Sequence, residues 1–487
     1  MNYKFTLRLL GIVALCEGAL LLAPLILSAV KGEDWMSCAV TIGIAVVFGL
    51  PLALFCKPKN KSIRVTGGLV SCSLCWILMS VIGCLPFVFS NNGVSFLDAL
   101  FETVSGFTTT GATIFNNPED LGLAINLWRA MTHWVGGMGM LLFVIAFLPK
   151  TEGTTYQVFK AETPGPKAGK LVSKLSITAR ILYLIYFGMT VLCAVLLLCG
   201  GVPIYDSIVL SFATAGTGGF TPNALGIAMY DSLYVEVVIT VFMFLFSINF
   251  TLYYFALVGK VKELFRSEEV RWFFSIIVLV TAGVTASLWV DKVYATFGEC
   301  LRVSVFQVVS NISTTGYVLR EDTGQWPAIA QTLLLAVMFC GGCAGSTAGG
   351  LKVSRIVILG KSGARELRTS LNPNRVLDIK LEGRIADKNV VHGVLRYFVV
   401  YVMFIALSVL ALVIFNPTKG SQATLMDAIT STISCVNNVG PGAFDFASGN
   451  FASITPAGKA IMIVDMLAGR LEILPILMLF NPRSWQR

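Results

Sequence analysis

The sequence predicts an all-α polytopic membrane protein. Hydrophobic residues occupy 55% of its 487 positions and charged residues only 13%, whereas a soluble domain surrounds its core with a charged exterior. Apolar runs of about 20 residues recur along the chain, and each is long enough to cross a hydrocarbon core of about 30 Å. Lys and Arg gather in every second connection between these runs. The net charge of +9 is therefore a sign of membrane topology, and we expect no nucleic-acid partner.

Ten membrane spans are predicted. The first contains Glu17 and has no small-residue cleavage site, so we interpret it as a retained helix and not as a signal peptide. Basic residues also lie near both chain ends, and the positive-inside rule then places both termini in the cytoplasm. The predicted spans cover residues 9–30, 36–56, 66–90, 124–149, 180–200, 234–259, 272–293, 328–360, 392–416 and 456–481.

The last four span pairs share one pattern. Between the two spans of each pair lies an apolar stretch too short to cross the bilayer, followed by small polar residues and a glycine. We name these stretches pore-loop segments one to four. They cover residues 95–111, 205–218, 299–316 and 423–440, and they end at Gly111, Gly218, Gly316 and Gly440. The glycines are 107, 98 and 124 residues apart, and such internal repetition predicts a repeated structural unit.

The repetition divides the chain into five parts. Two extra transmembrane helices (1–60) come first. Four repeats of span, pore loop and span follow, placed around one pore, and they cover residues 61–165, 166–265, 266–385 and 386–487.

Acidic residues precede the glycines at a similar spacing. Asp98 and Asp427 lie thirteen residues before their glycine, and Asp206 lies twelve before its own. In segment three, Val303 occupies the thirteen-residue position and Glu299 lies further back. We interpret the acidic residues as first-turn residues of a short helix, which the helix dipole favours, in preference to an acidic vestibule that concentrates cations.

The four segments suit a filter for a dehydrated cation. A ring of backbone carbonyls can replace the water of such an ion, and successive carbonyls point at one axis only where some residues take a positive φ, which Gly tolerates. The short helix before each loop would direct its partially negative C-terminus at the ion. The predicted ion-binding residues are Thr109, Thr110, Gly111, Gly216, Thr217, Gly218, Thr314, Thr315, Gly316, Asn438, Val439 and Gly440.

A glycine-rich segment at 341–350 interrupts the predicted span 328–360. Each glycine in a helix interior costs about 1 kcal/mol relative to Ala, so this segment is predicted to be unwound and to face a cavity. Close helix packing through small residues is the alternative. The candidate gate residues are Gly345, Ser346, Thr347, Ala348, Gly349 and Gly350.

Arg470 lies in the middle of the last predicted span. A charge at that depth is costly and normally faces a partner or water. Two interpretations are open. Arg470 could pair locally with Asp465 or Glu472, or it could lie beside the conduction path as an electrostatic barrier or as a latch on the glycine-rich segment.

Three motifs resemble a known family. SGFTTTGAT at 105–113, NISTTGYV at 311–318 and GGCAGSTAGG at 341–350 are similar to motifs of the Trk/Ktr/HKT superfamily of potassium transporters. The bacterial Trk-type membrane subunit is the most similar member, because it also carries two helices before its first repeat. The resemblance covers essentially the whole chain. It implies potassium uptake across the bacterial cytoplasmic (inner) membrane through a channel-like pore, with K⁺ at the filter residues and the glycine-rich segment as the gate.

The resemblance also implies partners. It predicts a homodimer with one pore per protomer, surrounded by membrane lipid, and a peripheral cytosolic subunit with nucleotide-binding RCK domains that docks on loops such as 361–388. In this chain K⁺ is the transported ion and no cofactor is expected. In relatives that pass sodium, a serine often replaces the first filter glycine, so Gly111 favours potassium.

Other functions remain as alternatives. Segments two and four depart from the full motif, so a poorly selective K⁺/Na⁺ channel is one alternative. A sodium- or proton-coupled potassium symporter is another. A coupled secondary transporter would use paired broken helices, whereas only one span here is conspicuously broken by glycines. An intramembrane enzyme is disfavoured, because the two histidines, His133 and His392, belong to no metal-ligand motif.

Overall fold

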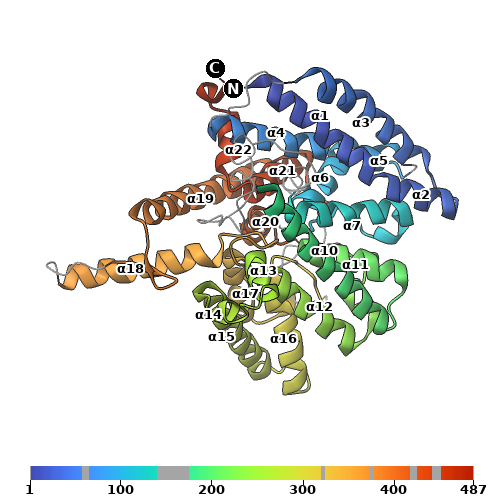
Figure 1. Cartoon of the computed structure of the whole chain (residues 1–487). Coiled ribbons are helices and arrows are strands. Elements are labelled where there is room, and N and C mark those ends of the chain that lie inside the picture. The colour runs from blue at the N-terminus through green and yellow to red at the C-terminus, as the bar shows by residue number, and fades with distance from the viewer. Residues whose placement is uncertain are drawn as a thin grey trace.

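The computed structural model describes residues 2–57, 65–90, 92–139, 175–319, 324–372, 378–416, 425–440 and 451–485. Helices dominate (Figure 1), and the strands within these ranges are the two-residue pair β1 (Lys380–Leu381) and β2 (Arg384–Ile385). Among the described residues, six helical spans are long and apolar enough to cross a membrane, and one bent pair makes a seventh if it is taken as a single span. The predicted class, an all-α polytopic membrane protein, is confirmed.

The N-terminal helices pack closely against one another. They are α1 (Tyr3–Leu20), α2 (Leu22–Lys31) and α3 (Met36–Phe55). A Cβ added to Gly11 of α1 would lie 2.7 Å from the carbonyl oxygen of Gly49, and one added to Gly49 would lie 2.8 Å from that of Gly11. The two helices therefore touch backbone to backbone at this crossing.

The rest of the chain follows the predicted order of span, short helix and span. The region of repeat one holds α4 (Val65–Gly83), α5 (Leu85–Phe89), α6 (Phe96–Phe107), η1 (Pro118–Leu121) and α7 (Leu123–Met138). Repeat two holds α10 (Leu175–Cys199), α11 (Ile204–Gly216), η2 (Gly226–Tyr230), α12 (Leu233–Phe246) and α13 (Phe250–Leu257). Helix α14 (Lys262–Arg266) lies at the predicted boundary between repeats two and three, and repeat three holds α15 (Glu268–Val290), α16 (Phe297–Ile312), α17 (Ala328–Cys340) and α18 (Val353–Leu371). Repeat four holds α19 (Lys388–Phe415), α20 (Leu425–Asn437), α21 (Pro456–Arg470), α22 (Leu474–Leu479) and η4 (Pro482–Trp485).

Several predicted spans are interrupted within the described residues, although the sequence indicated an interruption in only one of them. The span 328–360 breaks at the glycine-rich segment, as predicted, between α17 and α18. The span 234–259 bends by 95° between α12 and α13, where Asn249 caps α13 by accepting the N–H of Thr251 at 2.9 Å. The span 456–481 breaks before Pro475, which cannot continue a helix from α21 because its ring would clash with an earlier carbonyl. The second half of the predicted span 124–149 lies outside the described residues.

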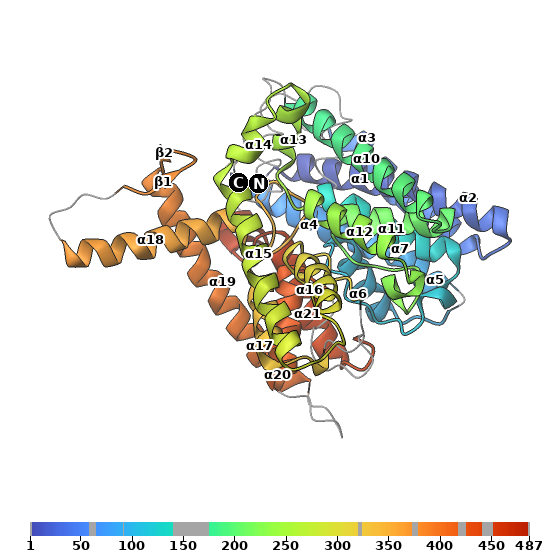
Figure 2. The same cartoon turned by 90° about the horizontal axis from the view of Figure 1, so that it is seen from below.

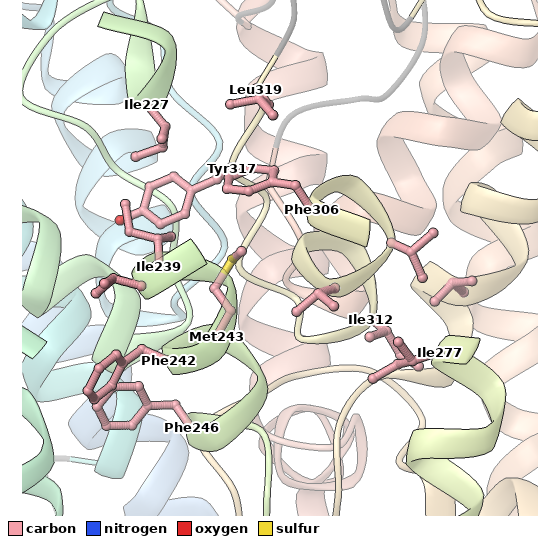
Figure 3. Packing of buried hydrophobic residues seen from close by; sticks show 14 of the residues in the cluster. Ile227, Ile239, Phe242, Met243, Phe246, Ile277, Phe306, Ile312, Tyr317 and Leu319 are labelled. Atoms are coloured by element: carbon pink, nitrogen blue, oxygen red, sulfur yellow. The ribbon is translucent and has the colours of Figure 1, made fainter. Parts of the chain in front are cut away.

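Two large apolar clusters hold these helices together. One joins α10–α12 to α15–α17, and Figure 3 shows part of it, with Phe242 and Phe246 of α12 and Tyr317 just after α16. The other joins the N-terminal helices to α6, α7 and α21. The chain ends lie side by side (Figure 1), and the hydroxyl of Tyr3 donates to the carbonyl of Trp485 at 2.6 Å. The side of the membrane on which they lie stays a prediction.

The close α1–α3 crossing gives a stability prediction. Gly49→Val should lower the midpoint of thermal unfolding in detergent, because the new side chain must displace α1, and overpacking of this kind costs about 1–3 kcal/mol. Gly43→Val is the matched control, since Gly43 lies in the same helix and a Cβ there meets nothing within 4 Å. Equal losses in the two variants would contradict the close crossing and point to helix propensity alone.

Candidate functional site

Each of the four short helices begins with an acidic residue in its first turn. The helices are α6, α11, α16 and α20, and the residues are Asp98, Asp206, Glu299 and Asp427. Ser95 caps α6 by accepting the N–H of Asp98 at 3.2 Å, and Thr296 caps α16 by accepting that of Glu299 at 3.2 Å. The acidic residues are first-turn residues, as predicted, and Glu299 takes this place in segment three.

The four helices end in the same backbone turn. Just beyond each helix, one residue without glycine's freedom adopts a positive φ of 54–57°: Thr109, Thr217, Thr314 and Asn438. The N–H of each donates to the carbonyl three residues earlier, and the next N–H donates to the carbonyl five residues before it. Two positions further on comes a glycine with positive φ: Gly111, Gly219, Gly316 and Gly440. The segments are therefore conformationally equivalent.

This equivalence corrects the sequence alignment of segment two. The residue that matches Gly111 is Gly219, and Gly218 matches Thr110 instead. Gly216, predicted as an ion ligand, is the last residue of α11. The corrected alignment moves the glycine to thirteen residues after Asp206 (219 − 206), the spacing found in segments one and four. Because Gly218 and Gly219 are consecutive, the sequence alone does not show which of them matches Gly111.

The equivalent glycines lie against the neighbouring segments. A Cβ on Gly111 would be 1.9 Å from the carbonyl oxygen of Gly218, and a Cβ on Gly219 would be 2.0 Å from that of Thr315. A Cβ on Gly440 would be 2.6 Å from the carbonyl oxygen of Thr110. Segment one thus adjoins two, two adjoins three, and four adjoins one. These contacts join the four segments in the order four, one, two, three.

The residues where the segments meet carry no charge. The three residues before Gly111, all threonines, are buried, and so are Thr217, Thr314 and Asn438. Within the described residues, no group of three or more His, Cys, Asp or Glu side chains could hold a metal ion. Carbonyl and hydroxyl oxygens without net charge suit a monovalent cation that must both bind and leave.

Two buried groups that the sequence interpretation did not assign lie behind segments one and two. The Nδ1 of His133 lies 2.8 Å from the carbonyl oxygen of Gly106, and its Nε2 accepts the N–H of Phe220 at 3.3 Å. The other group is the ion pair of Arg129 and Glu102, whose Nε and Oε1 atoms are 2.5 Å apart. The sequence signal was available, since a charge predicted inside a span needs a partner.

The glycine-rich segment contacts the ends of segments three and four. The N–H of Gly349 donates to the hydroxyl of Thr314 at 2.7 Å, and a Cβ on Gly349 would be 2.3 Å from the carbonyl oxygen of Asn437. The bend between α12 and α13 holds the other end of the segment. There the N–H of Cys343 donates to the carbonyl of Ser247 at 2.9 Å, and the N–H of Phe250 donates to that of Gly345 at 3.0 Å.

Arg470 connects the glycine-rich segment to α7. Its guanidinium donates to the carbonyl of Thr347 at 2.9 Å, to that of Gly137 at 2.7 Å and also to that of Gly136. Of the two acidic residues considered as its local partners, Asp465 accepts a hydrogen bond from Ser408, and Glu472 forms an ion pair with Arg355 at 2.6 Å. The contact with Thr347 is the one that the latch interpretation requires.

Comparison with known proteins assigns the family. A sequence profile described as "TrkH: Cation transport protein" matches residues 37–487. The chain belongs to the TrkH family. It is 34% identical to the Trk system potassium uptake proteins TrkH of Salmonella typhimurium and of Escherichia coli, over 100% of each chain. It is also similar to the crystal structure of the potassium transporter TrkH from Vibrio parahaemolyticus, with a TM-score of 0.89 and 29% identity over 100% of both chains.

Membership of the TrkH family confirms the resemblance seen in the motifs and the helical membrane fold. The family is one of cation transport proteins, so the expectation of a transporter in place of an enzyme is also confirmed. The roles of the filter and gate residues, the repeat boundaries, the homodimer and the regulatory subunit stay predictions.

The corrected alignment can be tested by adding one methyl group. Gly219→Ala should reduce cation flux into liposomes below that of the wild type, because its Cβ would lie 2.0 Å from the carbonyl oxygen of Thr315 and the facing backbone would have to shift. Gly201→Ala is the matched control, since Gly201 has the same φ of 82° but a Cβ there meets nothing within 4 Å. Normal flux through folded Gly219→Ala would contradict the placement of this glycine against segment three.

Proposed function

We propose that this protein takes up potassium across the bacterial cytoplasmic membrane through one channel-like pore with a backbone-carbonyl selectivity filter. The observation that carries the proposal is the packing of Gly111, Gly219 and Gly440 against the carbonyl oxygens of neighbouring segments. Such packing suits a narrow ring of carbonyls, which can replace the hydration shell of K⁺. The printed names of the relatives, Trk system potassium uptake proteins, agree with it.

The filter residues of this proposal are the predicted set with Gly219 in place of Gly216, which is the last residue of α11. K⁺ binds at Thr109, Thr110, Gly111, Thr217, Gly218, Thr314, Thr315, Gly316, Asn438, Val439 and Gly440, with Gly219 completing segment two. The four short helices end at these residues, and the partial negative charge at a helix C-terminus favours a cation there. Glycine in all four equivalent positions favours potassium over sodium.

The glycine-rich segment is the gate in this proposal. Within this segment, Gly349 contacts Thr314 and Asn437 at the ends of α16 and α20. In this proposal, ions that leave the filter meet the segment next. Arg470 holds it there by its contact with Thr347. The gate opens when this contact breaks and the segment moves aside.

Coupled transport is a second candidate, and one observation favours it. The second spans of repeats two, three and four are broken, at α12/α13, α17/α18 and α21/α22, whereas the sequence indicated only the break in repeat three. Paired broken helices occur in ion-coupled transporters. A potassium uptake assay with an imposed sodium or proton gradient separates the candidates, because only a coupled transporter is driven by it.

Partners belong to the same proposal. A peripheral nucleotide-binding subunit of the RCK type docks on α18 and the β1–β2 hairpin, which extend away from the helical bundle (Figure 2). Because α18 directly follows the glycine-rich segment, a partner that moves α18 moves the gate. The protein acts as a homodimer in the lipid bilayer, with both termini in the cytoplasm.

Ion selectivity tests the proposed function directly. Reconstituted wild-type protein should pass K⁺ and Rb⁺ faster than Na⁺ and Li⁺ in a liposome flux assay, because the carbonyl ring replaces the hydration of the larger ions. Gly111→Ser should lower the K⁺/Na⁺ flux ratio, since the new side chain disturbs the ring. Equal K⁺ and Na⁺ flux through the wild type would overturn the assignment of a potassium filter.

The latch gives a second prediction. Arg470→Ala should raise K⁺ flux above that of the wild type, because the glycine-rich segment loses its contact at Thr347. Arg302→Ala is the control, since Arg302 forms an ion pair with Glu236 of α12 at 2.5 Å and should leave gating unchanged. Thermal unfolding in detergent verifies that both variants are folded. Unchanged flux through folded Arg470→Ala counts against the latch.

A further inference from the structure

The ion pair of Glu102 and Arg129 lies inside the protein, between α6 and α7. The side chain of Glu102 is fully buried and that of Arg129 is 2% exposed. Burying two charges carries a desolvation cost that their attraction often only offsets, so such a pair is weak evidence for stability. The other contacts of the two side chains therefore indicate more about their role than the ion pair itself.

Glu102 holds the chain that leaves pore-loop segment one. Its Oε1 accepts the hydroxyl hydrogen of Thr113 at 2.9 Å, and its Oε2 accepts the backbone N–H of Ile114 at 3.0 Å. Thr113 follows Gly111 by two residues. The carboxylate of α6 thus fixes the outer end of its own filter segment.

Arg129 holds the chain that leaves pore-loop segment two. Its Nη1 donates to the carbonyl of Thr221 at 3.1 Å, and its guanidinium lies over the ring of Phe220, 3.6 Å from the centroid. These residues directly follow Gly219. Phe220 is also held from the other side, because its ring packs on that of His133 with centroids 4.0 Å apart.

We propose that Glu102 and Arg129 are positioning residues that set the selectivity of the filter by fixing the spacing between pore-loop segments one and two. The proposal rests on the proposed filter function. One charge pair joins the exits of two adjacent segments, whose backbones touch at Gly111 and Gly218. Any change in its length shifts one carbonyl set against the other. Discrimination between K⁺ and Na⁺ depends on the size and field of the carbonyl ring, so this shift lowers selectivity.

The two charges of the ion pair also neutralise each other. Arg129 brings a positive charge behind a filter that has to admit cations, and the carboxylate of Glu102 neutralises it at 2.5 Å. Loss of Glu102 alone would leave that charge unpaired and buried, which is strongly destabilising. The test therefore uses variants that keep both charges or remove both.

Three variants separate positioning from charge. Glu102→Asp keeps the charge but shortens the side chain by one methylene, and Arg129→Lys keeps the charge but lacks the planar fork that reaches Glu102 and Thr221 together. The double variant Glu102→Gln with Arg129→Gln removes both charges. The matched controls are Glu236→Asp, Arg302→Lys and the double Gln variant of that pair, which also joins two helices at 2.5 Å.

The measurements are the K⁺/Na⁺ flux ratio in liposomes and the midpoint of thermal unfolding. We expect the ratio to fall about tenfold in the Glu102 and Arg129 variants, equivalent to about 1.4 kcal/mol of differential binding, while K⁺ flux persists. The control variants should keep the wild-type ratio. A wild-type ratio in Glu102→Asp or in the double variant overturns the proposal, also where the midpoint has fallen, because the pair then has a structural role only.

The same assay separates this inference from the proposed function. A wild-type protein that does not discriminate between K⁺ and Na⁺ overturns the filter itself. A selective wild type with unaffected Glu102 and Arg129 variants overturns only the positioning role.

Discussion

Backbone packs directly against backbone where the four pore-loop segments meet. No side chain, not even a methyl group, fits between Gly111 and the carbonyl oxygen of Gly218, or between Gly219 and that of Thr315. Real Cβ atoms keep further away, so a side chain at either position would force the facing backbone to shift. Because the contact is so close, a movement of one segment must displace the backbone of its neighbour.

The neighbouring segments are held together in different ways. Segments one and two are joined by Arg129, Glu102 and His133 of α6 and α7. Segments two and three are joined by the hydroxyl of Tyr317, which lies 3.2 Å from that of Thr214. Segments four and one are joined by the amide of Asn438, which donates to the hydroxyl of Thr110 at 2.9 Å. Segments three and four meet through Gly349 of the glycine-rich segment. The four junctions therefore use different side chains, although the segments share one backbone conformation.

Repetition and composition predicted the helical membrane class, the pattern of short helices and three of the four equivalent glycines. The sequence did not identify Gly219, because two adjacent glycines fit the same motif and only the φ angles distinguish them. It also missed the bend between α12 and α13. That bend contains no glycine, and it is stabilised by a hydrogen bond from the distant Cys343 to Ser247, a contact that no local pattern reveals. Arg129 could have been found, since it is a charge inside an apolar helix.

The contact of the glycine-rich segment with Thr314 and Asn437 has a consequence for symmetry. In a symmetric pore made of four identical subunits the four quarters are equivalent, so all four are rigid or all four can move. A single chain with four different segments is free of that condition. Here segments one and two are joined by an internal ion pair, and segments three and four touch the glycine-rich segment. In the proposed function, one chain thus combines a stationary half of the filter with a half that lies against the gate.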